Sequence, residues 1–300
     1  MKAVLLNGYG GVDQLTYGDA PDPKPQAGEV LVKVAGTSVN PIDWKIRRGE
    51  RRDSVPIKFP AILGRDVAGT VAEDGKTSGF KTGDRVMGLV NQAYAEFLVA
   101  KSETLTRVPD GMELEDAAAL PLVVTTGAQL IENGVQPKAG QTLLVTGALG
   151  NVGRTAVYVA KKHGMTVIAG VRARERKQAE ALGADRIVAI DDEQGIASMG
   201  EVDAIADTVG HDVITKLMPY IRASGVLASV LGKPAGADGK NFTVRAVSAQ
   251  PDAAQLHQLA EAVANGEFSI PIARRMKLSQ AREAQRLAEA GGIGKIVLVP

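Results

Sequence analysis

The stretch Leu143-Leu-Val-Thr-Gly147-Ala-Leu-Gly150-Asn-Val-Gly153 decides the fold of this 300-residue chain. An apolar run leads into three spaced glycines and then into a segment of helical composition. Glycines at such places allow a tight turn, close approach of the backbone to a pyrophosphate, and close packing of helix on strand. Free N–H groups and the positive end of the helix dipole would then face the phosphates. This pattern predicts a dinucleotide site, with a tight turn lacking a ligand as the alternative. The residues predicted to contact the dinucleotide here are Gly147, Gly150, Asn151, Val152 and Gly153.

Strands and helices are predicted to alternate downstream of this motif. The strands read as short apolar runs, as expected for strands buried on both faces. Such alternation indicates β-α-β crossovers and a parallel sheet with helices on both sides, which is a doubly wound α/β fold. The predicted strands are 142–146, 166–171, 186–190, 203–207 and 226–231, and the predicted helices are 151–163, 174–182 and 212–221.

The first 108 residues predict a different, β-rich architecture. Short alternating segments at 29–39, 66–72, 84–90 and 94–100 are separated by turn residues, which favours a barrel. After Gly266 come an extended stretch (270–273), an amphipathic helix (279–290) and a strand (294–299), which cannot bury a core alone. We therefore predict one domain from residues 1–121 and 267–300, and a dinucleotide-binding domain from residues 122–266.

The end of the strand 166–171 predicts which dinucleotide is bound. An NAD site needs a carboxylate there for the ribose hydroxyls, whereas the 2′-phosphate of NADP needs cations. The sequence Val171-Arg-Ala-Arg-Glu-Arg-Lys177 has no acidic residue at the strand end, and a guanidinium can bind a phosphate in bidentate fashion. We predict NADP(H), with a solvated basic helix start as the alternative. The predicted phosphate contacts are Arg172, foremost, with Arg174 and Lys177.

Composition excludes several other classes of protein. The net charge of +1 gives no electrostatic footprint for nucleic acid or an anionic membrane. No apolar run approaches the roughly 20 residues of a membrane span, and the N-terminus lacks the pattern of a signal peptide, so we expect a cytoplasmic protein. The absence of Cys excludes disulfides, thiol nucleophiles and thiolate zinc ligands.

Several motifs in order along the chain resemble the quinone oxidoreductase and enone reductase branch of the medium-chain dehydrogenase/reductase superfamily, which includes zeta-crystallin. This resemblance implies a GroES-like β-barrel catalytic domain, a Rossmann domain and a cleft between them. It also implies hydride transfer from NADPH to a quinone or an α,β-unsaturated carbonyl. The motifs include Asn40-Pro-Ile-Asp-Trp-Lys-Ile-Arg47, Leu63-Gly-Arg-Asp-Val-Ala-Gly-Thr70, Ala118-Ala-Leu-Pro121, Asp207-Thr-Val-Gly210 and Gly294-Lys-Ile-Val-Leu298.

The chain departs from the zinc-dependent members of that superfamily. Those enzymes use Cys and a Gly-His-Glu motif as ligands, whereas this chain has no Cys and reads Gly64-Arg65-Asp66. The three histidines, at 163, 211 and 257, are predicted to lie in or beside helices of the dinucleotide-binding domain, at spacings that form no ligand set. No metal site is therefore predicted, and metal-assisted alcohol oxidation is not expected.

The resemblance places Asn40, Asp43 and Lys45 on one short loop beside the nicotinamide. Hydride transfer to an enone or quinone drives negative charge onto a carbonyl oxygen, which a donor must stabilise. Lys45 is predicted to supply that donor and to steer a water that delivers the proton, with a surface lysine as the alternative. In the family that the chain resembles, some quinone oxidoreductases carry Tyr at the position of Lys45, whereas enone reductases tend to carry Lys. The resemblance therefore favours an enone substrate. Asp43 is predicted either to orient Lys45 or to cap the loop.

Further site residues follow from the same pattern. Thr126, near a predicted helix start, resembles a cofactor-contacting position, with a helix-cap hydroxyl as the alternative. Val209 and Gly232 follow two predicted parallel strands at the carboxyl edge, where ligands bind in such sheets. Asp66 is predicted either to pair with Arg65 or another basic residue or to touch substrate, and Tyr94 is predicted to be a core residue.

Two other functions remain open from the sequence. An enoyl-thioester reductase of the same fold would need a basic patch, for which Arg47, Arg48, Arg51 and Arg52 are candidates. A non-enzymatic NADPH-binding structural or sensor protein is the other alternative. By analogy we expect a homodimer formed through an edge strand, either 226–231 or 242–247.

Overall fold

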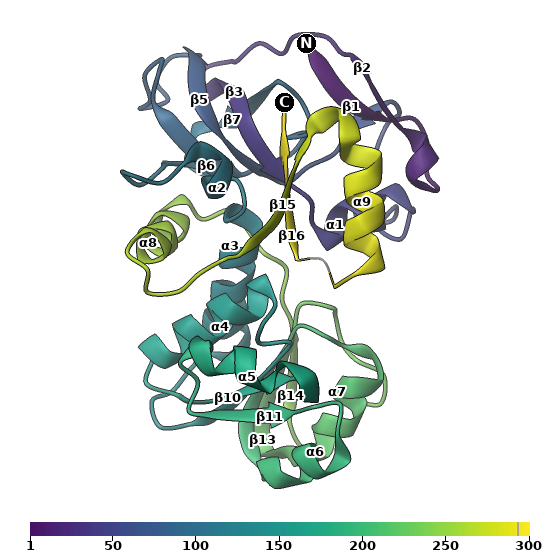
Figure 1. The fold of residues 1–300 in the computed structure, drawn as a ribbon, viewed down its shortest axis with the longest axis vertical. Coiled ribbons are helices and arrows are strands. Elements are labelled where there is room, and N and C mark those ends of the chain that lie inside the picture. Colours follow the sequence, from purple (N-terminus) through teal and green to yellow (C-terminus); the bar gives the residue numbers. More distant parts are fainter. Residues whose placement is uncertain (293) are drawn as a thin grey trace. The chain divides into compact units, whose positions relative to one another are not determined.

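The computed structural model describes residues 1–292 and 294–300, and its packing divides the chain into two compact units (Figure 1). The first unit contains Met1–Leu122 and Pro251–Pro300, and the second contains Val123–Gln250. The predicted domain end at residue 266 therefore lies beyond helix α8 (Ala253–Ala264), which belongs to the first unit. α8 packs against strand β8 (Leu105–Arg107), and its His257 ring nitrogen lies 3.3 Å from the Arg107 carbonyl oxygen.

The second unit is built on a six-stranded, all-parallel sheet in the order β11-β10-β9-β12-β13-β14. The chain begins at the central strand β9, winds outward to one edge, and then returns to wind outward to the other. This arrangement confirms the predicted doubly wound fold. The strands are β9 (Thr142–Thr146), β10 (Thr166–Val171), β11 (Arg186–Ala189), β12 (Val202–Asp207), β13 (Ile221–Ser229) and β14 (Thr243–Ala246).

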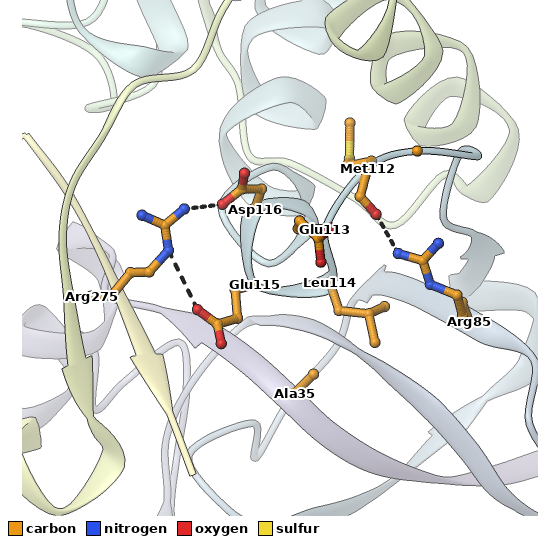
Figure 2. A pocket seen from close by; sticks show the side chains of 9 residues that line it. Ala35, Arg85, Met112, Glu113, Leu114, Glu115, Asp116 and Arg275 are labelled. Carbon is orange, nitrogen blue, oxygen red and sulfur yellow. Dashed lines mark hydrogen bonds and ion pairs between the residues drawn. The ribbon is translucent and has the colours of Figure 1, made fainter.

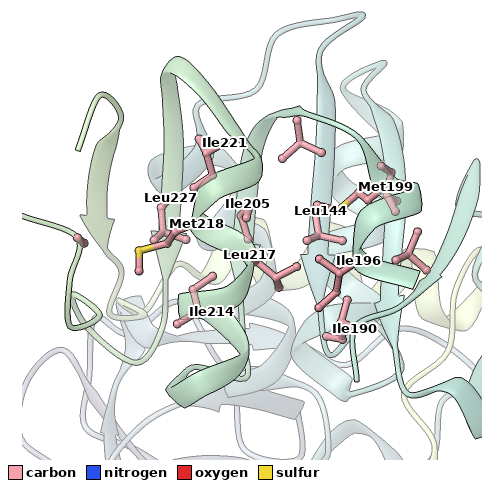
Figure 3. Packing of buried hydrophobic residues seen from close by; sticks show 14 residues of the cluster. Leu144, Ile190, Ile196, Met199, Ile205, Ile214, Leu217, Met218, Ile221 and Leu227 are labelled. Atoms are coloured by element: carbon pink, nitrogen blue, oxygen red, sulfur yellow. The ribbon is translucent and has the colours of Figure 1, made fainter. Parts of the chain in front are cut away.

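Apolar side chains of strands and helices interlock in the second unit (Figure 3). Leu144 and Ile205 from the sheet, together with Ile196 and Leu217 from two helices, are almost completely buried. Their burial removes apolar surface from water at roughly 25 cal/mol per Å². The α-helices are α3 (Pro121–Gln129), whose first two residues belong to the first unit, α4 (Asn151–Lys162), α5 (Arg176–Ala179), α6 (Glu193–Met199) and α7 (His211–Leu217), and a π-helical turn (Leu130–Val135) follows α3.

Three helical segments of the second unit differ from prediction. The helix expected at 212–221 is α7 followed by a 3-10 turn (Met218–Tyr220), and residue 221 already belongs to β13. The helix expected at 174–182 is a 3-10 turn (Ala173–Glu175), α5, and a second 3-10 turn (Glu180–Leu182). Helix α6 was not predicted. It is seven residues long and includes Gly195, which is needed because a Cβ there would lie 2.3 Å from the Ala189 carbonyl oxygen. The Asp192 side chain caps α6 by accepting from the Gly195 N–H at 2.8 Å.

The first unit contains the predicted β-rich domain. Its main sheet has the order β15-β16-β3-β5-β6-β8, with β7 also paired to β3. Strand β16 pairs antiparallel with β3 through Val297 opposite Ser38, which confirms that the C-terminal segment returns to this domain. These strands are β3 (Glu29–Ser38), β5 (Asp66–Asp74), β6 (Arg85–Leu89), β7 (Phe97–Lys101), β8, β15 (Ile272–Lys277) and β16 (Lys295–Val299).

A smaller sheet and three helices complete the first unit. Strand β1 pairs with both β2 and β4. The strands are β1 (Lys2–Leu6), β2 (Leu15–Asp19) and β4 (Ala61–Ile62), and the helices other than α8 are α1 (Pro41–Arg47), α2 (Leu114–Ala117) and α9 (Ala281–Ala290). Helices α1 and α9 contact one another, and both bury apolar side chains in one cluster with β1 and β16.

Candidate dinucleotide and catalytic sites

The glycine turn of the second unit connects β9 directly to α4. Gly147 has φ +62°, in the left-handed region that favours glycine. A Cβ on Gly147 would lie 2.6 Å from Thr208 Oγ1, and a Cβ on Gly153 would lie 2.3 Å from the Gly147 carbonyl oxygen. A side chain at either place would therefore crowd the turn and force its backbone or its neighbours to shift.

The start of α4 has the features of an anion site. Gly150 is the N-cap residue and gives α4 no side-chain cap, so the first N–H groups of this helix have no such partner. Gly150 is exposed, and Asn151 and Val152 are partly exposed, whereas Gly153 is buried against the turn. The turn and helix start thus fit a pyrophosphate, which would be held by backbone N–H groups and the helix dipole.

A buried carboxylate, Asp207, fixes the carboxyl edge of the sheet around this turn. Its Oδ1 accepts hydrogen bonds from Thr146 Oγ1 (2.9 Å), Gly210 N (2.9 Å) and Val209 N (3.1 Å). Its Oδ2 accepts from Ser229 Oγ at 2.8 Å. One carboxylate therefore joins the ends of β9, β12 and β13. The sequence motif contained Asp207, but we did not predict this role.

The loops after β12 and β13 carry two predicted cofactor residues, Val209 and Gly232. Val209 is held by Asp207, and a Cβ on the adjacent Gly210 would lie 2.6 Å from Leu231 Cδ1. The two loops therefore lie side by side at the carboxyl edge of the sheet. Gly232 has φ +94° and nothing within 4 Å of a Cβ position, so backbone conformation rather than crowding favours glycine there.

Thr126 lies on helix α3, next to the start of α4. A Cβ on the adjacent Gly127 would lie 2.6 Å from both the Val152 carbonyl oxygen and Thr155 Cβ, so α3 packs tightly on the first turns of α4. Thr126 is the sixth residue of α3 and not at its start. A helix-cap role for Thr126 is therefore wrong, and its contact with the cofactor stays a prediction.

The predicted phosphate-binding residues follow β10. The turn contacts this strand end, since Ala148 N donates to the Gly170 carbonyl oxygen at 3.1 Å. Arg172 is 53% exposed, with its Nε 3.4 Å from Glu175 Oε1, and its backbone N–H donates to Glu175 Oε2 at 3.2 Å. Glu175 is thus a partner of Arg172 that we did not predict. Arg174 and Lys177 are both exposed.

A cluster of buried polar side chains lies in the first unit, made of Ser38, Asn40, Asp66 and Lys295. Asp66 is completely buried and Lys295 is 3% exposed, and their charged groups lie 3.3 Å apart. Asn40 donates through Nδ2 to Asp66 Oδ2 at 2.7 Å and accepts through Oδ1 from Lys295 Nζ at 2.7 Å. Ser38 Oγ also donates to Asp66. Burial lowers the pKa of Lys295.

Asp66 also binds backbone outside this cluster. Its Oδ1 accepts from the N–H of Leu122, in the first turn of α3, at 2.6 Å. A carboxylate at a helix N-terminus is favourable because it meets free N–H groups and the positive end of the dipole. Of the two roles predicted for Asp66, the structure shows pairing, with Lys295 rather than Arg65. The role of Lys295 was missed because its partners are more than 200 residues away in the chain.

The segment that carries Asn40, Asp43 and Lys45 is helix α1 and its N-cap, so the predicted loop is wrong. Pro41 at the first helical position and a hydrogen bond from Asn40 N to Asp43 Oδ2 (2.8 Å) start the helix. Asp43 also accepts from Tyr94 Oη at 2.9 Å. Burial raises the pKa of Asp43 to about 7 and that of Tyr94 well above its ordinary value.

Lys45 is partly exposed and differs in this respect from its two neighbours in the prediction. Asn40 and Asp43 are each 1% exposed, and their polar groups bind one another, Tyr94 and the Asp66–Lys295 pair. Residues two apart on a helix do not face each other. Of the two roles predicted for Asp43, the structure therefore shows capping, and Lys45 is left as the accessible polar group of α1.

The comparisons with known proteins agree with this geometry. Residues 26–110 match the family model "Alcohol dehydrogenase GroES-like domain", and residues 182–298 match the family model "Zinc-binding dehydrogenase". A chloroplast envelope quinone oxidoreductase homolog of Arabidopsis thaliana is 30% identical over 326 aligned positions, which cover 100% of this chain and 98% of the relative.

The chain belongs to the quinone oxidoreductase branch of the medium-chain dehydrogenase/reductase superfamily. The solved quinone oxidoreductase of Coxiella burnetii is 29% identical, with a TM-score of 0.90 over 100% of this chain and 99% of that one. A mycobacterial protein solved in complex with NADPH is 26% identical, with a TM-score of 0.85 over 100% of both chains. This family member is therefore an oxidoreductase with a pyridine-nucleotide-binding, GroES-like plus Rossmann fold.

One family model names zinc, but the residues of this quinone oxidoreductase family member do not fit a zinc site. The sequence has no Cys, and the described residues contain no group of three or more His, Asp or Glu side chains placed to hold a metal ion. Arg65 stands where zinc-dependent enzymes have the motif histidine, and the next residue, Asp66, is paired with Lys295. Two of the histidines lie beside carboxylates: His163 is 3.5 Å from Glu132, and His257 is 3.4 Å from Glu261.

The basic patch considered for an enoyl thioester is weaker than predicted. Arg47 is 1% exposed, so its inclusion in a surface patch is wrong. Its guanidinium binds Gln285 Oε1 (2.8 Å), the Gly10 carbonyl oxygen (2.6 Å) and Glu289 (2.5 Å), and Arg48 also pairs with Glu289. Arg47 and Arg48 thus join α1 to α9, so two of the four arginines of the predicted patch are already paired.

A pocket of about 590 Å³ in the first unit is lined by none of the predicted site residues (Figure 2). Its charged side chains are largely paired: Arg275 binds Glu115 (3.4 Å) and Asp116, and Arg85 donates to the Met112 carbonyl oxygen.

Among residues 1–292 and 294–300, every helix is too short or too polar to cross a bilayer. The Arabidopsis relative is named for the chloroplast envelope, so a cytoplasmic location stays a prediction.

Proposed function

We propose that this protein reduces quinones or α,β-unsaturated carbonyls with a hydride from NADPH, and that it does so without a metal. The observation that carries the proposal is the set of cations after β10, adjoining a glycine turn shaped for a pyrophosphate. The named activity of the relatives and the NADPH complex of the mycobacterial neighbour support it. The lack of fitting zinc ligands among the described residues supports the metal-free part.

NADPH is favoured over NADH by the chemistry of Arg172. Its present partner is Glu175, at 3.4 Å from Nε, and Arg172 is half-exposed. Exposed ion pairs contribute little, about 0–1 kcal/mol. A 2′-phosphate carries more charge than one carboxylate and matches the guanidinium fork, so it can replace Glu175 as the partner. Arg174 and Lys177 add positive potential on the same exposed segment.

Hydride transfer to a carbonyl compound requires that the developing negative charge be stabilised and that a proton be delivered, and we assign both roles to the first unit. NADPH, when bound, supplies the hydride. Lys45 then stabilises the negative charge that develops on the carbonyl oxygen and steers the water that delivers a proton. Asn40 and Asp43 are proposed as positioning residues, because their polar groups are bound within the buried network that starts α1.

Cofactor preference is tested with Arg172→Asp and, as a matched control, Arg176→Asp, an exposed arginine of the same basic run. Dissociation constants for NADPH and NADH are measured by nucleotide fluorescence. Arg172→Asp should weaken NADPH binding at least about tenfold, which is the loss of one charge-assisted hydrogen bond, and should leave NADH binding unchanged or improved. The control should weaken NADPH binding less than Arg172→Asp does, because Arg176 adds only to the positive potential of the segment, and it should leave NADH binding unchanged. Unchanged NADPH affinity in Arg172→Asp would overturn the assignment.

Substrate class is tested by NADPH oxidation with a quinone, an enone and an enoyl thioester side by side. Turnover of the first two over the third is expected, and Lys45→Met should lower kcat about a hundredfold with a smaller effect on KM. Lys33→Met, an exposed lysine on β3, is the control and should have wild-type rates. Preference for the thioester would favour the neighbouring activity, and NADPH binding without any turnover would favour a non-enzymatic role.

A homodimer is also proposed, through β14. Of the two candidate segments, residues 226–231 are excluded because β13 pairs with both β12 and β14, whereas β14 is an edge strand of the sheet. An edge strand with unpaired backbone groups needs a cover. Sedimentation should give twice the 31.3 kDa chain mass, and a monomer at micromolar concentration would overturn this proposal.

A further inference from the structure

Arg154 lies on the first turn of α4 and binds the glycine turn itself. It is the fourth residue of this twelve-residue helix, and it is partly buried. Its Nε donates to the Leu149 carbonyl oxygen at 3.0 Å, inside the segment that connects Gly147 to Gly150. Side chains of a helix lean toward its N-terminus. The guanidinium is therefore held at the end of α4 where the turn begins.

The charge of Arg154 has no anionic partner among the described residues. Its hydrogen-bond partner is a backbone carbonyl oxygen, and no ion pair joins Arg154 to a carboxylate of the described residues. Partial burial also lowers the pKa of Arg154. A cation at a helix N-terminus is also unfavourable, because the dipole is positive there. By contrast, Lys161 lies at the C-terminal end of the same helix and pairs with Asp185 at 2.7 Å. Arg154 therefore has the charge, the fixed position and the unfavourable surroundings that a bound anion would relieve.

We propose that Arg154 is a phosphate ligand of the dinucleotide site and binds the pyrophosphate beside the glycine turn. This inference rests on the proposed binding of NADP(H) at that turn. The Leu149 carbonyl oxygen accepts a hydrogen bond only from Nε of Arg154. Both terminal nitrogens of the guanidinium can therefore donate to phosphate oxygens. Two different arginines would then bind the two anionic groups of the cofactor: Arg154 would bind the pyrophosphate and Arg172 the 2′-phosphate.

Fragments of the cofactor separate the two arginines. ADP-ribose carries the pyrophosphate but no 2′-phosphate, and 2′-AMP carries the 2′-phosphate but no pyrophosphate. Calorimetric titration of Arg154→Met should show ADP-ribose binding weakened at least about tenfold and 2′-AMP binding unchanged. Arg172→Asp should show the reverse. Lys161→Met, which removes a cation from the other end of α4, should bind both fragments as the wild type does.

The variant Arg154→Lys and the melting temperature of the unliganded protein show whether Arg154 binds phosphate or only stabilises the glycine turn. A phosphate ligand predicts partial recovery of ADP-ribose affinity in Arg154→Lys and an unliganded melting temperature close to wild type in both variants. Unchanged ADP-ribose affinity in Arg154→Met overturns the proposal, as does loss of 2′-AMP binding alone. A fall in melting temperature with equal loss of both fragments also overturns it. Failure of Arg172→Asp to weaken 2′-AMP would count only against NADP preference.

Discussion

The buried pair of Asp66 and Lys295 gives a prediction whose size follows from the structure. In Lys295→Met the Asp66 carboxylate, completely buried, keeps hydrogen bonds from Ser38, Asn40 and Leu122 but loses the cation with which it forms an ion pair. Asn40 Oδ1 loses its donor at the same time. Removing one partner of a buried pair typically costs about 3–5 kcal/mol, because an uncompensated charge remains. We expect a loss of that size in Lys295→Met.

Trp44 provides a local assay for this loss. It is the single Trp of the sequence and lies on α1, next to Asp43, so its fluorescence reports on the first unit. Urea unfolding followed by Trp44 fluorescence gives the free energy of unfolding of the unit that contains the pair. In a thermal scan the loss corresponds to a fall of roughly 6–20 °C, at about 2–4 °C per kcal/mol for a unit of this size.

A double variant separates the pair from simple damage to packing. In Asp66→Asn/Lys295→Met no buried charge remains, so the double variant should lose less than the sum of the two single variants. Lys33→Met, an exposed lysine on β3, should stay within about 0.5 kcal/mol of wild type. If Lys295→Met unfolds within about 1 kcal/mol of wild type, or if the two losses simply add, the charge pairing described for this cluster is incorrect.

Two further predictions concern the protonation of Asp43 and the glycine turn. Because burial raises the pKa of Asp43 from its ordinary value of 3.8 to about 7, the folded state holds a proton that the unfolded state has lost between these values. The Trp44-reported stability of the wild type should therefore fall as pH rises from about 4 to 7, by up to about 1.4 kcal/mol per pH unit. Asp43→Asn should flatten that profile, and an unchanged slope would refute the burial argument. In the second unit, Gly153→Ala places a Cβ 2.3 Å from the Gly147 carbonyl oxygen, so NADPH affinity should fall more than about tenfold in a fluorescence titration. Gly18→Ala, where nothing lies within 4 Å, should bind as the wild type does, and equal affinity in the two variants would contradict the role of the turn.

The second unit was predictable from sequence where its structure is local. Strands β9 and β10 have the predicted bounds, and α4 begins at the predicted Asn151 because the glycines and the apolar runs are adjacent in the chain. Helix α1 carried a readable signal as well, since Asn40-Pro41 followed by Asp43 is a helix start. At seven residues, however, α1 is too short for its periodicity to distinguish a helix from the expected loop. Helix α6 is just as short and includes a glycine, so its periodicity is too brief to detect.

The buried networks could not be predicted because their partners are far apart in the chain. Lys295 binds Asn40 across 255 residues, and Ser229 binds Asp207 across 22. Composition and motif spacing give no sign of which strand ends meet. The same limit applies to Glu175, which stood in the basic run but was not recognised as the partner of Arg172. Contacts that depend on sheet order and strand pairing therefore had to come from the structure.

The most direct test of the central claim is the ratio of kcat/KM for NADPH to that for NADH, measured with one quinone in the presence of a zinc chelator. The cations after β10 and the absence of fitting zinc ligands among the described residues predict a ratio of at least about ten that the chelator does not change. A ratio of one or less, or loss of activity on chelation, would contradict the account.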